Sequence, residues 1–176
     1  MRSTLTVRTP RAPMSSSAPR SGIRLTFWNC NGLSTYKVRQ LTRFARVTEV
    51  AALALCETKR PESQLPDIRG FDAFGVCGER RSGGVALYTN VEYGSRSLTT
   101  TEVGSSSCCW SEMRIGRLAV VVGVFYIHPE ATADDARTLL STIGESLTRR
   151  GDLPHLLVGD FNARCEIGRA SCRERV

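Results

Sequence analysis

Five side chains that can contact a metal ion or a phosphate follow the ends of apolar segments in this sequence. They are Asn29, Glu57, Tyr126, Asp160 and Asn162, and the segments that precede them are 23–27, 51–56, 118–125 and 155–158. In α/β proteins, ligands collect at the carboxyl ends of strands. We therefore expect these residues, which lie far apart in the sequence, to form one metal-and-phosphate site.

The residue types indicate the chemistry of this predicted site. A carboxylate such as Glu57 or Asp160 at the end of a buried strand has little water around it and needs a cation or hydrogen-bond donors to stay ionised. Carboxylate oxygens are hard ligands, which favours Mg²⁺ or Mn²⁺ over a thiolate-binding metal. Asn29 and Asn162 can donate and accept hydrogen bonds without adding charge. The hydroxyl of Tyr126 can donate to charge that develops on a phosphate.

Each residue also has a purely structural interpretation when it is considered alone. Asp160 follows a glycine and could cap a helix or form a turn. Glu57 could pair with Lys59 or Arg60, and Tyr126 could belong to the hydrophobic core. Only the order and the local sequence of all four segments together favour a catalytic site.

The elements around these residues predict a mixed α/β fold. The expected strands are 23–28, 51–56, 71–76, 83–89, 96–101, 108–115, 118–126 and 155–158. One expected helix spans 35–47, with Leu41, Phe44, Ala45 and Thr48 on its apolar side. A second begins at Thr132 and ends at Arg149 and Arg150, with a buried stripe of Ala136, Leu139, Leu140, Ile143 and Leu147. The run of strands between 71 and 126 reads as a meander, which argues against a purely parallel sheet.

Composition narrows the class of protein. The 176 residues are 41% hydrophobic and 23% charged, which is typical of a globular domain. No apolar segment approaches the roughly 18–20 residues that span a bilayer. Without a secretory signal, the seven cysteines are expected to be free thiols of a nuclear or cytoplasmic protein. Of the net charge of +7, residues 1–22 contribute +4 and the last eleven residues contribute +1. Because most of the positive charge lies at the two ends of the sequence, it is weak evidence for a DNA-binding surface.

Five short motifs occur together in one order: FWNCNGL (27–33), LCETK (55–59), GGVAL (83–87), FY (125–126) and VGDFNA (158–163). They resemble the endonuclease/exonuclease/phosphatase superfamily, and within it the apurinic-type endonuclease domain of LINE-type non-LTR retrotransposons. The resemblance covers about residues 23–164. It implies a two-sheet α/β sandwich that hydrolyses DNA phosphodiesters with Mg²⁺ or Mn²⁺, fused to a reverse transcriptase in its parent protein.

The resemblance also implies a role for each motif residue. Asn29 and Glu57 would belong to the metal site, and Tyr126 would contact the scissile phosphate. Asp160 would position or activate the attacking water, and Asn162 would orient that water or the phosphate. Two further residues of the same motifs, Asn31 and Lys59, are expected to contact the substrate.

The sequence departs from the family pattern at its end. The second half of such a domain supplies another Asp and an Asp-His pair, for which this chain has no counterpart. Residues 166–176 resemble a translated sequencing adapter. We therefore expect a disordered basic tail over 1–22, a truncated domain over 23–165 that forms about the first half of the sandwich, and a non-native end.

This truncation carries expectations for stability and activity. Loss of a partner sheet would expose strands such as 118–125, so the chain is expected to be marginally stable and weak or inactive. Two alternatives within the superfamily are an apurinic-site DNA repair nuclease and a phosphatase. An alternative of another class is a non-catalytic fragment that at most binds nucleic acid.

Overall fold

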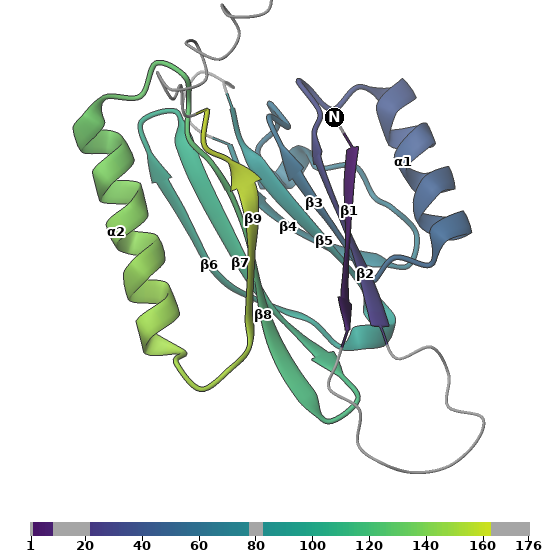
Figure 1. The fold of residues 1–176 in the computed structure, drawn as a ribbon. Helices are drawn as coiled ribbons and strands as arrows, with labels where there is room; N and C mark the ends of the chain where they lie inside the picture. The colour runs from purple at the N-terminus through teal and green to yellow at the C-terminus, as the bar shows by residue number, and fades with distance from the viewer. Residues whose placement is uncertain (1, 9–21, 78–82, 163–176) are drawn as a thin grey trace, which may run out of the picture.

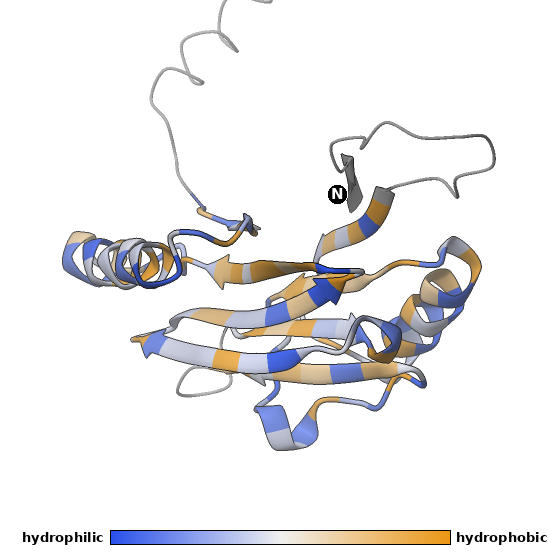
Figure 2. Ribbon diagram, turned by 90° about the horizontal axis from the view of Figure 1, so that it is seen from below, coloured by the Kyte–Doolittle hydropathy of each residue, from blue (hydrophilic) through white to orange (hydrophobic). Residues whose placement is uncertain are grey.

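The computed structural model describes residues 2–8, 22–77 and 83–162, which form two β-sheets packed face to face (Figure 1). One helix covers the outer face of each sheet, so the layers run helix, sheet, sheet, helix. Figure 2 shows the two helices on opposite sides of the stacked sheets. Three apolar clusters fill the three spaces between layers, and the central one contains residues of both sheets.

The first sheet is built entirely from the part of the chain before residue 91. Its strands are β1 (Arg2–Arg8), β2 (Gly22–Asn29), β3 (Ala52–Cys56), β4 (Phe71–Val76) and β5 (Val85–Asn90), and they lie in the order β1-β2-β3-β5-β4. Only β2 and β3 are parallel. Helix α1 (Thr35–Thr48) connects these two strands, and a short 3-10 helix, η1 (Glu62–Gln64), precedes β4.

The second sheet follows in the chain after the short 3-10 helix η3 (Val91–Tyr93). Its strands are β6 (Arg96–Val103), β7 (Ser106–Ile115), β8 (Leu118–Tyr126) and β9 (His155–Asp160), in the order β6-β7-β8-β9. The first three form the expected antiparallel meander. Helix α2 (Ala133–Arg149) then returns the chain so that β9 runs parallel to β8.

Each sheet therefore contains one parallel strand pair joined by a helix, and these two pairs supply the predicted site. In the first sheet, β2 ends at Asn29 and β3 is followed by Glu57. In the second sheet, β8 ends at Tyr126 and β9 ends at Asp160. Parallel strands joined by a crossover helix place both carboxyl ends at the same edge of a sheet, and the packed sheets bring the two edges together.

Both helices form where the sequence predicts them. The side chain of Ser34 caps α1 by accepting the amide of Lys37. At α2, Thr132 and Asp135 form a reciprocal capping box, which satisfies two amides that have no partner within the helix. The buried stripe of α2 differs at two positions from the expected one, because Leu140 is 44% exposed and Ser146 is buried. Leu140 lies one residue beyond buried Leu139 and turns away from the sheet.

Two expectations from the sequence are wrong. Residues 2–8, expected to be disordered, form a strand that pairs antiparallel with β2. This segment, RSTLTVR, is rich in the β-branched residues that favour strands, and β2 offers it an open edge. The other wrong expectation is that strand 118–125 would be exposed. Seven consecutive residues of β8 from Val120 onward are buried between the first sheet and α2. Enough of the second sheet is present to form the sandwich, and β9, at its edge, is half-buried.

The structure confirms the α/β class and the partial two-sheet sandwich. Residues 163–176, which include the expected adapter-derived end and the last residues of the domain expected over 23–165, lie outside the described residues. In the described part of the chain, no helix has the length and apolar character needed to cross a bilayer.

Candidate active site

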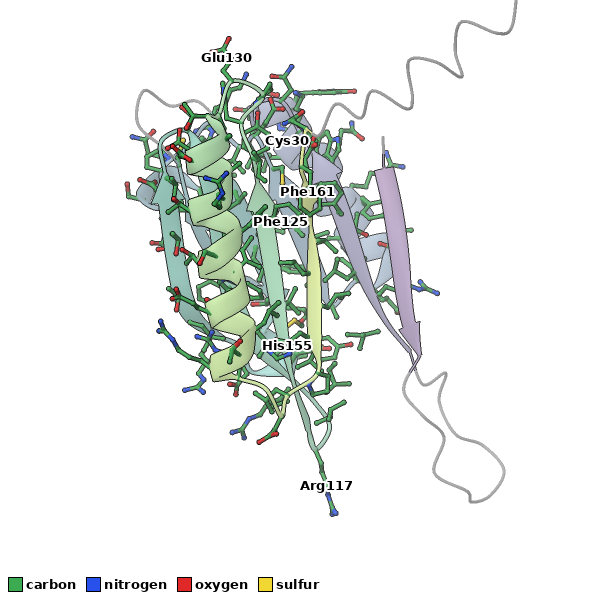
Figure 3. The ribbon with its side chains drawn as sticks, turned by 60° about the vertical axis from the view of Figure 1, so that its left-hand side comes forward. Cys30, Arg117, Phe125, Glu130, His155 and Phe161 are labelled. Atoms are coloured by element: carbon green, nitrogen blue, oxygen red, sulfur yellow. The ribbon has the colours of Figure 1, made fainter. Side chains whose placement is uncertain are left out.

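The predicted site residues lie at one end of the sandwich. Figure 3 shows Cys30 and Phe161, which follow β2 and β9, near this end, whereas His155 and Arg117 lie at the opposite end. Strand pairing holds the backbone of three site residues: Asn29 is the register partner of Cys56, and Tyr126 is the partner of Asp160. The positions of these three side chains therefore depend on the parallel pairs β2-β3 and β8-β9.

One amide group joins the two acids of the site. The Nδ2 atom of Asn29 donates hydrogen bonds of 2.8 Å to Oε1 of Glu57 and of 2.8 Å to Oδ2 of Asp160. The two carboxylate oxygens are therefore no more than twice that distance apart. Asn29 and Asp160 are separated by 131 residues in the sequence, so the contact depends on the packing of the two sheets.

Tyr126 is placed to donate a hydrogen bond at neutral pH. The residue is buried, with 2% of its surface exposed. Burial is the main cause that raises the pKa of its hydroxyl, and the negative charge of Glu57, a hydrogen bond with Glu57, and the charge of Asp160 raise it further. The hydroxyl thus remains protonated next to both acids.

Asp160 combines a structural contact with the site contact. Its Oδ1 atom accepts the backbone amide of Asn162 at 3.0 Å, which forms the turn that one structural interpretation anticipated. Its Oδ2 atom faces Asn29. The side-chain nitrogen of Asn162 donates to the carbonyl of Ile127 at 2.8 Å. This bond fixes the Asn162 amide beside the end of β8, at the edge of the site.

Asn31 and Lys59 extend the hydrogen-bonded chain toward solvent. The Nζ atom of Lys59 donates to Oδ1 of Asn31 at 2.6 Å, and the amide of Asn31 donates to Oδ1 of Asn29 at 3.2 Å. The alternative ion pairs of Glu57 do not form in the described part of the chain. Lys59 contacts Asn31 instead, and Arg60 donates to the carbonyl of Leu33.

The backbone at the site adopts conformations that side chains disfavour. Five described non-glycine residues have a positive φ: Asn31 at 42°, Glu49 at 52°, Glu57 at 53°, Lys59 at 54° and Asn162 at 45°. Glu49 caps the end of α1, and the other four belong to the site. A left-handed conformation costs about 1–2 kcal/mol for a residue with a Cβ atom. Such strain persists where surrounding contacts impose it, and it is typical of functional sites.

Gly83 and Gly84, the first two residues of the GGVAL motif, help to impose this geometry. The amides of Thr58 and Lys59 donate to the carbonyls of Gly84 and Gly83 at 3.2 and 2.9 Å. A Cβ atom on Gly83 would lie 2.8 Å from the ring of Tyr126, and one on Gly84 would lie 2.8 Å from Oγ1 of Thr58. Both positions therefore require glycine for close approach to the site loop.

Lys37 is another residue whose role the sequence did not indicate. Its ammonium group donates to three successive carbonyls, those of Cys30 at 2.5 Å, Asn31 at 3.1 Å and Gly32 at 3.1 Å. These three carbonyls belong to the loop that follows Asn29. The first turn of α1 thus holds the loop that places Asn29 and Asn31.

We expect Lys37→Met to lower the free energy of unfolding by about 1–3 kcal/mol, because three carbonyls lose a charged donor. Urea denaturation of the two proteins measures this difference. Arg39→Met is the matched control, since Arg39 is an exposed cation of the same helix and surface changes of this kind stay within about 0.5 kcal/mol. Equal losses in the two variants would contradict a specific role for Lys37.

The donor set fits a hard cation. The described residues contain no group of three or more His, Cys, Asp or Glu side chains that could hold a metal ion, which does not match a zinc site. Mg²⁺ keeps several of its waters and needs only one or two carboxylates together with a substrate phosphate, and Glu57 and Asp160 supply these. The nearby thiols are unsuitable ligands, because burial raises the pKa of Cys30 to about 11 and raises that of Cys56 further.

Comparisons with known proteins identify the family and the fold of the chain. A model of the endonuclease/exonuclease/phosphatase family matches residues 26–169. The human Nocturnin catalytic domain is similar with a TM-score of 0.64 and 12% identity, over 99% of this chain and 73% of that one. The endonuclease domain of TRAS1, a telomere-specific non-LTR retrotransposon, gives 0.62 and 14%, over 81% and 60%.

A phosphatase is also among the similar structures. The mannosyl-6-phosphatase Bt3783 of Bacteroides thetaiotaomicron has a TM-score of 0.56 and 13% identity, over 81% of this chain and 66% of that one. No curated protein sequence matches the chain significantly. At these identities the structural likeness shows the fold alone. The chain spans between about three fifths and three quarters of the three solved chains.

Proposed function

The chain belongs to the endonuclease/exonuclease/phosphatase family, as its motifs predict, and we propose that its site hydrolyses phosphodiester bonds of DNA with Mg²⁺ or Mn²⁺. The observation that supports this proposal best is the contact of Asn29 with both Glu57 and Asp160. An amide held between two carboxylates has no evident packing purpose. It keeps two acidic groups together at the surface end of the fold, where a phosphate can approach.

The proposed roles follow from the contacts of each side chain. Glu57, with Asn29 beside it, would hold the metal ion, which would neutralise charge on the phosphate. Asp160 would hold a proton of the attacking water, because its Oδ2 atom faces the site. The protonated hydroxyl of Tyr126 would donate to the oxygen that gains charge in the transition state. Asn162, fixed by its bond to Ile127, would orient the water or the phosphate.

The outer residues are proposed to contact the substrate strand. Lys59 is exposed, and its ammonium group lies on Asn31 at the rim of the site. A phosphate next to the scissile one would draw Lys59 away from Asn31, since a charged acceptor competes well with an amide oxygen. The side-chain nitrogen of Asn31, which takes no part in the bond to Lys59, would donate to the same strand.

DNA is the proposed substrate because the motifs resemble those of LINE-type endonucleases and the TRAS1 endonuclease domain shares the fold. We further propose that the full-length parent carries a reverse transcriptase and works in the nucleus or the cytoplasm. The similarity to a mannosyl-6-phosphatase keeps a phosphatase as a second candidate. A third candidate is an apurinic-site repair nuclease of the same family, which would use the same residues to cleave DNA at an apurinic site.

The test uses the purified chain and supercoiled plasmid DNA. Nicking is expected with Mg²⁺ and not with EDTA, and we expect Glu57→Gln and Asp160→Asn each to reduce it to background. Glu92→Gln, at an exposed acid outside the site, is the matched control and should nick as the unaltered chain does. Nicking that survives both site substitutions would contradict the assignment.

A binding measurement accompanies this assay, because we expect the hydrolytic activity of this chain to be weak. An ion present at ten times its Kd stabilises the folded state by about 1.4 kcal/mol. Thermal denaturation should therefore show stabilisation by Mg²⁺ in the unaltered chain and none in Glu57→Gln. Stabilisation without nicking would favour the non-catalytic alternative.

A further inference from the structure

Positive charge is concentrated on one helix of the sandwich. Helix α1 carries Lys37, Arg39, Arg43 and Arg46 and contains no acidic residue. Helix α2 carries three acids, and both of its arginines are paired: Arg137 with Asp134 at 2.6 Å and Arg149 with Glu145 at 3.4 Å. The two helices cover equivalent faces of the two sheets, so their common position does not explain the difference in charge.

Three of the α1 cations form a single exposed surface, which we call the α1 basic face and define by Arg39, Arg43 and Arg46. Their spacing of four and three residues places them on one side of an α-helix, and all three are exposed. The buried Leu41 and Ala45 occupy the opposite side, against the first sheet. Tyr36, 71% exposed, lies one turn before Arg39 on the same side.

The α1 basic face has no internal counter-charge among the described residues. None of the ion pairs in that part of the chain includes Arg39, Arg43 or Arg46. Like charges at this spacing repel one another and destabilise a helix, so the arrangement has a cost that a polyanion would remove. Arginine also suits phosphate, because its planar guanidinium group can form two parallel hydrogen bonds.

A cavity extends this surface at the far end of α1. The cavity has a volume of about 860 Å³, and Arg46 lines it together with Arg24 and Arg69. Glu49 and Glu92 also line it, so the cavity itself is mixed in charge. The uncompensated charge therefore lies on the exposed side of the helix, between this cavity and the candidate active site.

The other end of the α1 basic face adjoins the candidate active site. Lys37, in the first turn of α1, holds the loop that follows Asn29, and Arg39 follows two residues later. From Arg39 to Arg46 the helix rises by about 10 Å. A strand that leaves the site next to Asn31 and runs along the exposed side of α1 would meet these three arginines in succession.

We propose that the α1 basic face binds the phosphodiester backbone of duplex DNA that extends beyond the candidate active site. The position of the duplex rests on the proposed function, because that function places a DNA strand in the site. Binding through this face does not require hydrolysis or a metal ion. Its test can therefore be separated from the test of the nuclease.

The experiment measures binding of a fluorescent 30-base-pair duplex by anisotropy in EDTA, over a range of salt concentrations. Each phosphate that a cation neutralises contributes about 0.9 to the slope of log K against log salt. The triple variant Arg39→Gln, Arg43→Gln and Arg46→Gln should thus lower the slope by about 2.7. The control triple variant Arg114→Gln, Arg117→Gln and Arg137→Gln removes the same charge from exposed positions elsewhere and should leave the slope unchanged.

Glutamine preserves helix propensity, and the single variant Arg43→Gln, expected to lower the slope by about 0.9, repeats the test with the least disturbance. Equal slopes in the two triple variants would overturn the proposal, as would a failure of the unaltered chain to bind DNA. Preferential binding to vesicles of anionic lipid would also overturn it and indicate a membrane partner. If the unaltered chain does not nick DNA with Mg²⁺ but binds the duplex in EDTA through these arginines, the proposed function is wrong and the binding proposal stands.

Discussion

Raising the pH from 8 to 10 is expected to lower the free energy of unfolding by about 5 kcal/mol, because four buried thiols ionise only in the unfolded chain. Burial raises the pKa of Cys30 and of Cys108 from 9.0 to about 11, and raises the pKa of Cys56 and Cys109 further. Their contribution to stability is complete below pH 9, the value of an unfolded thiol, and is lost as the pH rises toward the folded values.

The size of this effect follows from the number of thiols. Each one that is ionised in the unfolded chain and neutral in the folded chain lowers stability by about 1.4 kcal/mol per pH unit. A whole domain is stabilised by only about 5–15 kcal/mol. The expected loss is therefore a large share of the total stability. The buried Tyr88 and Tyr126, whose pKa values are raised by burial, add to the loss above pH 10.

Urea denaturation at pH 8, 9 and 10, with a reducing agent present, measures the loss. Cys108→Ala provides the internal comparison, because the variant lacks one of the four thiols. Its own stability will be lower at every pH, but the fall between pH 8 and 10 should be smaller by about 1 kcal/mol. A fall of the same size in both proteins would show that thiol ionisation is not the cause.

The substitution Gly159→Ala is expected to lower the free energy of unfolding by about 3 kcal/mol. Gly159 pairs with Phe125 across β8 and β9. A Cβ atom there would lie 2.3 Å from the Phe125 carbonyl oxygen and 2.5 Å from its ring. Backbone atoms cannot rotate away, so β9 would have to move from β8 and carry Asp160 with it.

The same substitution at Gly144 supplies a control of opposite sign. Nothing lies within 4 Å of a Cβ atom at Gly144, which belongs to α2. Alanine is favoured over glycine by about 0.5–1 kcal/mol within a helix, so Gly144→Ala should stabilise the chain by that amount. Thermal and urea denaturation compare the two variants, and Gly159→Ala should also lose stabilisation by Mg²⁺. If Gly159→Ala is as stable as the unaltered chain, the close approach of β8 and β9 is wrong.

The sequence allowed most elements to be predicted because their signals are local. An apolar run of about five residues bounded by polar ones is typical of a buried strand, as at Ala52–Cys56. The ends of α2 are equally local, since Thr132 and Asp135 are three residues apart. The strand at Arg2–Arg8 has β-branched residues but no apolar run, so its local signal is weak. Its pairing with β2 requires a partner beyond a polar segment, and composition alone indicated a tail.

The site could be predicted in part for a related reason. The end of a strand is visible in the sequence, so Asn29, Glu57, Tyr126 and Asp160 could be placed at one edge of a sheet. The contacts that orient them could not be predicted. The three carbonyls around Lys37 and the left-handed backbone at Glu57 and Lys59 depend on loops whose path only the folded chain defines. The chemical roles of these residues stay predictions.

Charge shows how position in the chain differs from position in space. Counted along the sequence, the middle of the chain carries little net charge. In the structure, the described acids that balance this count lie on α2, in strands and in loops, whereas α1 has none. A small net charge therefore conceals a helix with four cations and no acid.

The division of the two sheets along the chain has a consequence for how the site comes into being. The strands of the first sheet end with Asn90, and those of the second sheet begin with Arg96. Each half can acquire its own strands and helix while holding only part of the reacting group. The Cys56 thiol, which donates to the Phe125 carbonyl at 3.0 Å, joins the halves just below the acids. The candidate site is therefore complete only after the two sheets have packed together. During synthesis, a chain that contains the first sheet alone is expected to have no hydrolytic activity.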